Sequence, residues 1–475
     1  MNEPRVRLPS VQFALLCIPV LLGPWLFGAW EMWWFWPFTL CVLLSSLLFG
    51  IRLLLPARPS EDGKVPGATR VPSAARQGAV VALLYGIFLL YALVRSLQAD
   101  VAMDAERSFL LHLTPFLVGI QVLFGLHPRR RRILYVLMAA NLFLIGAYGI
   151  ANHIATGSER VLWEAGYAKY FGEGRASGPY FCPDHFSGIM ELALALGLAL
   201  VLTRASETGW RLAGGGLCCI AAIGVVLSKS RGGGLTVLAV VAAAMVWGFT
   251  RWPSRKRWWW RLSWATSAAI ALLIFCNTGT GYMKRFTGYF ETTADTDAAL
   301  HDRAVTLVQR ARATSRGRMI GGALRAWRDA PLFGIGPGMH QHLWPHYAAS
   351  SDGNRERGAW PSLPNYDFHS YEVHSDWVQL LEEYGAVGLV LFLLPAGTLF
   401  IGLVRSTEYS AMLLGGVLSF VAMGFHSLGD FNLQMPGTTW TLAAILGLAA
   451  ADVTRRTRRS RRSRPAPVQN VKLDR

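Results

Sequence analysis

The chain has 475 residues, of which 52% are hydrophobic and only 16% charged, with a formal net charge of +17 at pH 7. A soluble protein carries about 25% charged residues, so the composition argues against an ordinary soluble enzyme. The basic residues lie in short connections and in a tail at 455–464 that directly follows an apolar segment. Topology control by positive charge explains this pattern, and no nucleic-acid partner is expected.

Apolar runs of about 18 to 22 residues recur along the chain, which is the length that crosses a bilayer. The sequence thus predicts an all-α polytopic membrane protein with about 12 transmembrane helices. The expected spans are 11–30, 33–55, 79–97, 109–126, 133–153, 185–203, 212–228, 233–250, 262–278, 377–404, 409–427 and 437–453. The first nine helices with their loops occupy 1–277, a large loop 278–376, three further helices 377–453 and a basic tail 454–475.

The connections between these spans alternate in charge. Basic residues concentrate in the connections within 52–76, 129–132, 204–211 and 251–261, and in the C-terminal tail. The positive-inside rule makes all of these cytoplasmic, together with both termini. The outer connections are then about 97–108, 154–184, 228–232, 278–376 and 427–437.

Two outer connections carry unusual polar residues. A turn rich in Gly and Pro delivers Arg175, Asp184 and His185 to the start of the sixth span. Asp184 is a good helix N-cap, whereas Arg175 suits a structural or a ligand-binding role equally. The hairpin 228–234 places Lys229 and Arg231 on the outer side, where the positive-inside rule makes cations uncommon. Arg231 beside a helix N-terminus is a candidate phosphate ligand, and snorkelling is the alternative.

The large loop contains one segment that reads as a helix. Residues 316–328, which include Arg318, predict a helix that ends before Pro331. The glycine-rich turn at 334–338 after it lets backbone approach a ligand closely, but no βαβ pattern supports a dinucleotide site. Three histidines between 340 and 346 have no neighbouring carboxylate or cysteine in sequence, so neither a metal nor a cofactor is expected.

The strongest catalytic candidate is His374, at the end of the large loop. Ser375 and Asp376 form a good N-cap pair, so the imidazole lies at the outer end of the tenth span, where it suits a general base or merely closes the loop. Glu382, one to two turns further on, needs a partner or a water-filled cavity. His426 and Asp430 place another histidine and aspartate in the last outer connection.

All these candidates share the outer side in the predicted topology. Several cations with one candidate base, at the edge of a bilayer, fit a substrate whose phosphate group is anchored in lipid and whose partner offers a hydroxyl. The polar groups gather at one face and no internal repeat is visible, which disfavours the competing class, a polysaccharide transporter.

At these residues the chain resembles the superfamily of O-antigen ligases and O-antigen polymerases, which includes bacterial protein O-oligosaccharyltransferases. The similarity covers about residues 100–450, and the spacing from Arg318 to Gly334 is similar to that of the polymerases' large periplasmic loop. Its motifs, in family order, are HFSG at 185–188, SRG at 230–232, PLFGIGPG at 331–338, HSDWVQLLEEYGAVG at 374–388 and HSLGDFNLQMP at 426–436.

The resemblance implies a GT-C-like, metal-independent, inverting glycosyltransferase of the bacterial inner membrane. It would transfer a glycan from undecaprenyl diphosphate to a hydroxyl on the periplasmic side, with ligation of O-antigen to lipid A-core favoured. Polymerisation and protein glycosylation are the alternatives.

The family motifs also imply roles for residues. His374 would be the base, while Arg231 and Arg318, assisted by Arg175, would bind the diphosphate. His185, Asp184, Asp430, His426 and Glu382 are possible supporting residues. The family often has asparagine where this chain has Asp184, which puts a direct diphosphate contact there in doubt.

Overall fold

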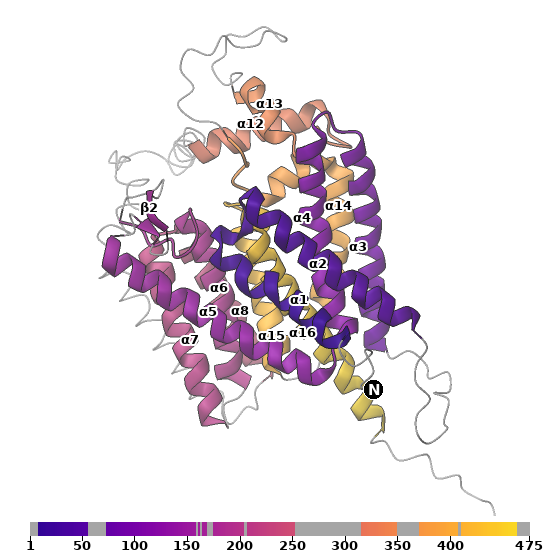
Figure 1. The fold of residues 1–475 in the computed structure, drawn as a ribbon, viewed down its shortest axis with the longest axis vertical. Helices are drawn as coiled ribbons and strands as arrows, with labels where there is room; N and C mark the ends of the chain where they lie inside the picture. The colour runs from indigo at the N-terminus through magenta and orange to yellow at the C-terminus, as the bar shows by residue number, and fades with distance from the viewer. Residues whose placement is uncertain are drawn as a thin grey trace, which may run out of the picture.

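The computed structural model describes residues 8–55, 73–157, 160–161, 164–168, 174–203, 207–251, 315–348, 370–406 and 410–462. Within them the chain is a bundle of long helices that run up and down between two ends (Figure 1). Nine helices of the described part are long and apolar enough to cross a membrane. The predicted fold class, an all-α polytopic membrane protein, is confirmed.

The long apolar helices are α1 (Leu8–Leu22), α2 (Met32–Leu54), α3 (Ser73–Leu97), α4 (Ala102–Ile120), α5 (Pro128–Thr156), α6 (Pro183–Thr203), α7 (Thr208–Ser228), α8 (Arg231–Arg251) and α14 (Asp376–Arg405). The bundle also contains the shorter α15 (Ala411–His426) and α16 (Pro436–Arg462), which continues into the basic tail. Every predicted span overlaps one of these helices except 262–278, which lies outside the described residues.

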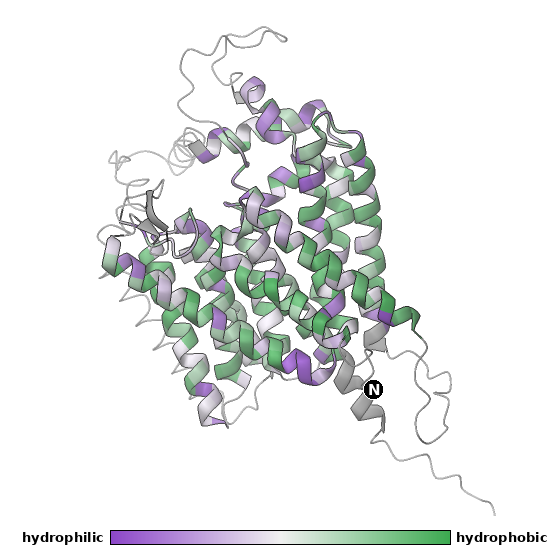
Figure 2. Ribbon diagram, viewed as in Figure 1, coloured by the Kyte–Doolittle hydropathy of each residue, from purple (hydrophilic) through white to green (hydrophobic). Residues whose placement is uncertain are grey.

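Two helices lie beyond the ends of the bundle's membrane-spanning helices. They are α12 (Ser315–Asp329), which agrees with the helix predicted at 316–328, and α13 (His340–Ala348). Apolar residues dominate the middle of the bundle, and polar residues gather around α12 and α13 (Figure 2). We call this the α12 end of the bundle. The remaining short helical elements are η2 (Gly23–Trp25), η3 (Phe27–Ala29), η4 (Gln121–Gly125) and η6 (Asn432–Gln434).

The sequence missed two local features. The connection after α5 contains a small antiparallel hairpin of β1 (Arg160–Val161) and β2 (Glu164–Ala168). In addition, α4 begins well before the predicted residue 109, because its polar first turns find partners. Asp104 lies 2.7 Å from Nε2 of His342, and Arg107 donates to the Trp30 carbonyl at 2.7 Å and lies over the Trp30 ring.

Helix α6 is the central helix of one half of the bundle. It is buried along nearly its whole length and packs against α5, α7, α8 and α15. In the other half, α14 packs on α3 and α16 packs on α4, while α15 contacts both α6 and α16. Figure 1 shows α5 to α8 on one side of α15 and α16, and α3, α4 and α14 on the other.

The glycine-rich turn 331–338 fastens the large loop to a break in α14. Gly385 has φ +69° inside the helix, and a Cβ there would lie 2.3 Å from the Leu332 carbonyl oxygen. The freed backbone of α14 pairs with the turn: the amide of Ile335 donates to the Glu382 carbonyl at 2.9 Å, and that of Ala386 to the Pro331 carbonyl at 2.9 Å. Gly334 and Gly385 therefore allow the turn and α14 to approach each other closely, while Gly338 lies against Asp104 of α4.

Candidate active site

A buried polar cluster at the α12 end is centred on Asp430, in the connection between α15 and α16. Its Oδ1 atom lies 3.1 Å from Nδ1 of His374 and 3.8 Å from Nε2 of His185. Its Oδ2 atom lies 3.7 Å from a guanidinium nitrogen of Arg316 and 3.7 Å from Nε2 of His426. Four segments that are distant in sequence thus meet at one carboxylate. We call these five residues the Asp430 cluster.

His374 is held in a strained but accessible position. Its φ of +58° is uncommon for a residue with a side chain, and such strain, which costs about 1–3 kcal/mol, concentrates at functional sites. Ser375 caps α14 by accepting a hydrogen bond from the Val378 amide, as the sequence predicted. The side chain of His374 is 24% exposed. Because Asp430 accepts the Nδ1 proton, Nε2 is the nitrogen with a free lone pair.

An aromatic ring separates the two histidines next to Asp430. Phe431 meets the ring of His374 edge-on, with centroids 4.7 Å apart, and the ring of His185 in the same manner at 4.4 Å. These contacts restrict the orientation of both imidazoles.

Asp184 bridges two arginines rather than capping a helix. It lies inside the first turn of α6, with Oδ1 2.7 Å from Arg175 and Oδ2 2.5 Å from Arg316. Arg175 also donates to the Ser228 carbonyl at 2.8 Å, and Arg316 to the Gly429 carbonyl at 2.8 Å. These contacts join the first turn of α6 and the segment before it, the end of α7, the first turn of α12 and the connection before α16.

The charges of the site depend on one another. Burial alone would raise the pKa of Asp430, but the positive charge of Arg316 and the hydrogen bond from His374 hold it well below its usual value. Burial would likewise lower the pKa of Arg316, but the carboxylates of Asp430 and Asp184 raise it. Asp430 is therefore ionised at neutral pH and oriented for a hydrogen bond from His374.

The two arginines expected at the diphosphate lie on helices next to this cluster. Arg231 begins α8 and is half-buried. It follows Lys229, whose φ is +50°, and Ser230, whose hydroxyl accepts from the Gly233 amide at 3.1 Å. Arg318 is exposed on α12, two residues after Arg316. Arg175, which the sequence also predicted at the diphosphate, belongs to the buried network through its contacts with Asp184 and Ser228.

Two buried acids were not among the site residues predicted from the sequence. Glu191, fully buried in α6, has Oε1 2.7 Å from Nδ1 of His426 and accepts from the Ser187 hydroxyl at 3.2 Å. Asp376 accepts from the Ser427 hydroxyl at 2.7 Å and from the Leu433 amide at 3.0 Å. A lone carboxylate within an apolar span, such as Glu191, is a recognisable sign of function.

Glu382 belongs to a separate cluster. Its Oε2 atom lies 2.8 Å from Nδ1 of His340 in α13, and Nε2 of His340 lies 3.0 Å from the Ser370 hydroxyl. The Ser370 hydroxyl donates its proton to the Glu372 carbonyl at 2.9 Å. Ser370, His340 and Glu382 therefore do not form a nucleophile with its general base. Burial would lower the pKa of His340, but the Glu382 carboxylate raises it.

The Asp430 cluster, with Glu191 beside it, retains hydrogen-bonding capacity. Among the described residues, Nε2 of His185, Nε2 of His426, Oδ2 of Asp430 and Oε2 of Glu191 are buried without a hydrogen-bond partner. Buried polar atoms in native proteins are nearly always paired, and exceptions indicate a functional role or a bound polar group.

The fold and the cluster together define a polytopic helical membrane protein with a buried acid–histidine–arginine site at one end of its bundle. Residues 216–393 match a family model described as O-antigen ligase. This match supports the resemblance to the O-antigen ligase superfamily that the motifs suggested. The matched segment includes Arg231, Arg316, Arg318 and His374. No curated protein shows significant similarity to the chain.

At the family level, this match supports glycosyl transfer of the ligase or polymerase type, with lipid-linked substrates in a membrane.

Proposed function

We propose that the protein transfers a glycan from undecaprenyl diphosphate to a hydroxyl acceptor at the periplasmic face of the bacterial inner membrane. The favoured reaction is ligation of O-antigen to lipid A-core. The observation that carries the proposal is the pairing of His374 with an ionised Asp430, beside an arginine-bridged Asp184. The α12 end is then the periplasmic end, and both termini are cytoplasmic.

In the proposed reaction His374 is the general base. Its Nε2 atom takes the proton of the acceptor hydroxyl while the hydroxyl oxygen bonds to the anomeric carbon of the glycan. The bond from that carbon to the phosphate oxygen breaks, the configuration inverts, and undecaprenyl diphosphate leaves. Asp430 keeps the Nδ1 proton in place and stabilises the imidazolium that forms.

The leaving diphosphate gains negative charge in the transition state, and fixed cations stabilise it. Arg231 and Arg318, which the family motifs place at the diphosphate, supply these cations, while Arg316 is bonded to Asp184 and lies near Asp430. Arg175 assists from its bond to Asp184. The proposed reaction uses neither a metal ion nor another cofactor.

Other acceptors use the same chemistry. A second lipid-linked glycan would make the protein a polysaccharide polymerase, and a protein side chain would make it an O-oligosaccharyltransferase. A polysaccharide transporter is the alternative of another class, but its site would lie near the bilayer midplane in repeated, broken helices. The Asp430 cluster instead gathers where α6, α14 and α15 meet their connections.

The test uses the purified full-length protein in lipid nanodiscs with undecaprenyl-diphosphate-linked O-antigen. Lipid A-core, a second lipid-linked repeat and an acceptor peptide are offered in turn, and mass spectrometry identifies which of them gains sugar. His374→Ala should reduce transfer by about 10²–10⁴-fold without loss of folding. His346→Ala, at an exposed histidine of α13, is the matched control. Unchanged transfer by His374→Ala would refute the base.

A second variant tests diphosphate binding. Arg231→Lys keeps the charge but loses the bidentate geometry of the guanidinium, so transfer should fall and the KM for the donor should rise. Wild-type kinetics in this variant would instead indicate that Arg231 only snorkels to the membrane surface.

A further inference from the structure

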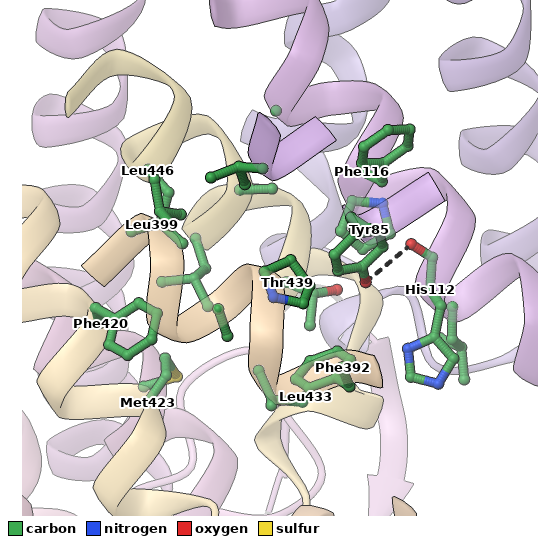
Figure 3. A pocket seen from close by; sticks show the side chains of 18 of the residues that line it. Tyr85, His112, Phe116, Phe392, Leu399, Phe420, Met423, Leu433, Thr439 and Leu446 are labelled. Carbon is green, nitrogen blue, oxygen red and sulfur yellow. Dashed lines mark hydrogen bonds between the residues drawn. The ribbon is translucent and has the colours of Figure 1, made fainter. Parts of the chain in front are cut away.

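A long apolar cavity lies in the half of the bundle that contains α3, α4 and α14. Its volume is about 240 Å³, and its lining comes from α3, α4, α14, α15 and α16. Figure 3 shows rings and aliphatic side chains pointing into it, among them Phe116, Phe392, Leu399, Phe420 and Leu446. Such a lining suits a hydrocarbon and gives a sugar almost no hydrogen-bonding partners.

The cavity extends far along the helices. On α14 its lining begins at Asp376 and reaches Leu399, and on the antiparallel α3 it reaches Gly78, near the opposite end of the bundle. From the break at Gly385 to Leu399 alone, α14 spans roughly 21 Å, which is more than half the thickness of the hydrocarbon core of a bilayer. A narrow apolar space of this length fits an extended lipid chain.

One end of the cavity lies close in sequence and in space to the candidate active site. Asp376, Gln379 and Glu383 are its charged or amide-bearing lining residues on α14, and Asp376 follows His374 by two positions. The Asp376 amide donates to the Asp430 carbonyl at 3.2 Å. A chain in the cavity would therefore hold its head group beside His374.

Three arginines are tied to the other half of the bundle, whereas Arg318 lies on α12, which packs on α13 and α14. Arg175 and Arg316 are held by Asp184 of α6, and Arg231 begins α8. Helices α6 and α8 pack on α15, whereas the cavity is walled by α3, α4 and α16 beyond it (Figure 1). Inversion at the anomeric carbon requires that the hydroxyl attack from the side opposite the leaving phosphate. The positions of Arg175, Arg231 and Arg316 therefore favour opposite sides of His374 for the two substrates.

We propose that this cavity binds the hydrocarbon chain of a lipid-anchored acceptor, so that the acceptor hydroxyl reaches Nε2 of His374 from the side opposite these three arginines. The inference rests on the proposed glycosyl transfer. It adds a binding site for the acceptor's lipid anchor, at residues that take no part in the chemistry.

The test fills the cavity. Ala443→Leu on α16 adds apolar volume to its wall, and Ala82→Leu on α3 does so from the opposite helix, in case the first variant fails to fold. Ala140→Leu, at an exposed position of α5, is the matched control. Initial rates are measured with undecaprenyl-diphosphate O-antigen and two acceptors: intact lipid A-core, and the same core oligosaccharide freed of its acyl chains.

Both cavity variants should raise the KM for intact lipid A-core by about tenfold, the loss expected if two methylenes leave the cavity. They should leave the KM for the donor and the rate with the delipidated core unchanged. An unchanged KM for lipid A-core overturns the inference. So does a raised KM for the undecaprenyl donor that disappears with a farnesyl donor, because the donor's chain would then occupy the cavity.

Failure of the proposed function would look different. Wild-type protein would then transfer sugar to neither acceptor, or His374→Ala would transfer as fast as wild type. A wild type that transfers with equal KM to both acceptors, and depends on His374, overturns only the assignment of the cavity.

Discussion

Oδ1 of Asp430 lies 3.1 Å from Nδ1 of His374, although 56 residues separate the two in the chain. The contact joins the end of the large loop to the connection between α15 and α16. It fixes which imidazole nitrogen can accept a proton, because the carboxylate holds the proton on the other. An imidazole held in this orientation accepts a proton from one defined direction.

Replacement of Asp430 by asparagine should impair catalysis more than folding. An amide can donate to Nδ1 and so favour the wrong tautomer, and it cannot stabilise the imidazolium. We expect kcat to fall by about 10²–10⁴-fold, with little change in the KM for the donor. Steady-state kinetics in nanodiscs measure this. Asp329→Asn, which alters an acid of α12 bonded to Tyr347, should retain wild-type kcat, and a wild-type kcat in Asp430→Asn would contradict the role of the pair.

Arg316 should matter for stability where Arg318 does not. Arg316→Ala leaves Asp184 without one of its arginines and Asp430 without its guanidinium. Loss of a fully buried partner costs about 3–5 kcal/mol, and we expect roughly 2–3 kcal/mol because the Arg316 side chain is 33% exposed. Thermal unfolding in detergent should show a clear fall in Tm for Arg316→Ala. Arg318→Ala should keep the wild-type Tm and lose activity instead; equal Tm losses would argue against this division.

The difference between these two arginines shows where sequence reasoning stops. Alternating spans and basic loops were enough to bring Arg175, His374 and Asp430 to one end of the bundle. Residues two apart in a helix point in directions roughly 200° apart, so the inward residue of α12 depends on the helix phase, which tertiary packing sets. The same limit hid the partners of Glu191 and Glu382, because each partner lies on another helix.

Gly385 should tolerate no side chain. A Cβ at this position would lie 2.3 Å from the Leu332 carbonyl oxygen, and the φ of +69° alone costs a non-glycine residue about 1–3 kcal/mol. Gly385→Ala should therefore release the turn 331–338 from α14 and lower both Tm and activity. Gly397→Ala, on the same helix with no atom within 4 Å of the added Cβ, is the control and should keep both. Faster proteolysis of the large loop in Gly385→Ala, but not in Gly397→Ala, would show that the turn 331–338 has been released from α14. Identical behaviour of the two variants would contradict this role of Gly385.

The His340–Glu382 contact should make stability depend on pH. The pKa of His340 is raised above 6.5 in the folded protein, because the Glu382 carboxylate lies 2.8 Å away and outweighs the effect of burial. A raised folded-state pKa contributes stability that is fully present below pH 6.5 and is lost as pH rises through the folded value. Tm in detergent should therefore fall as pH increases above about 6.5. His340→Gln should flatten this slope, and His346→Gln should not; a slope that survives in His340→Gln would assign the titration to another group.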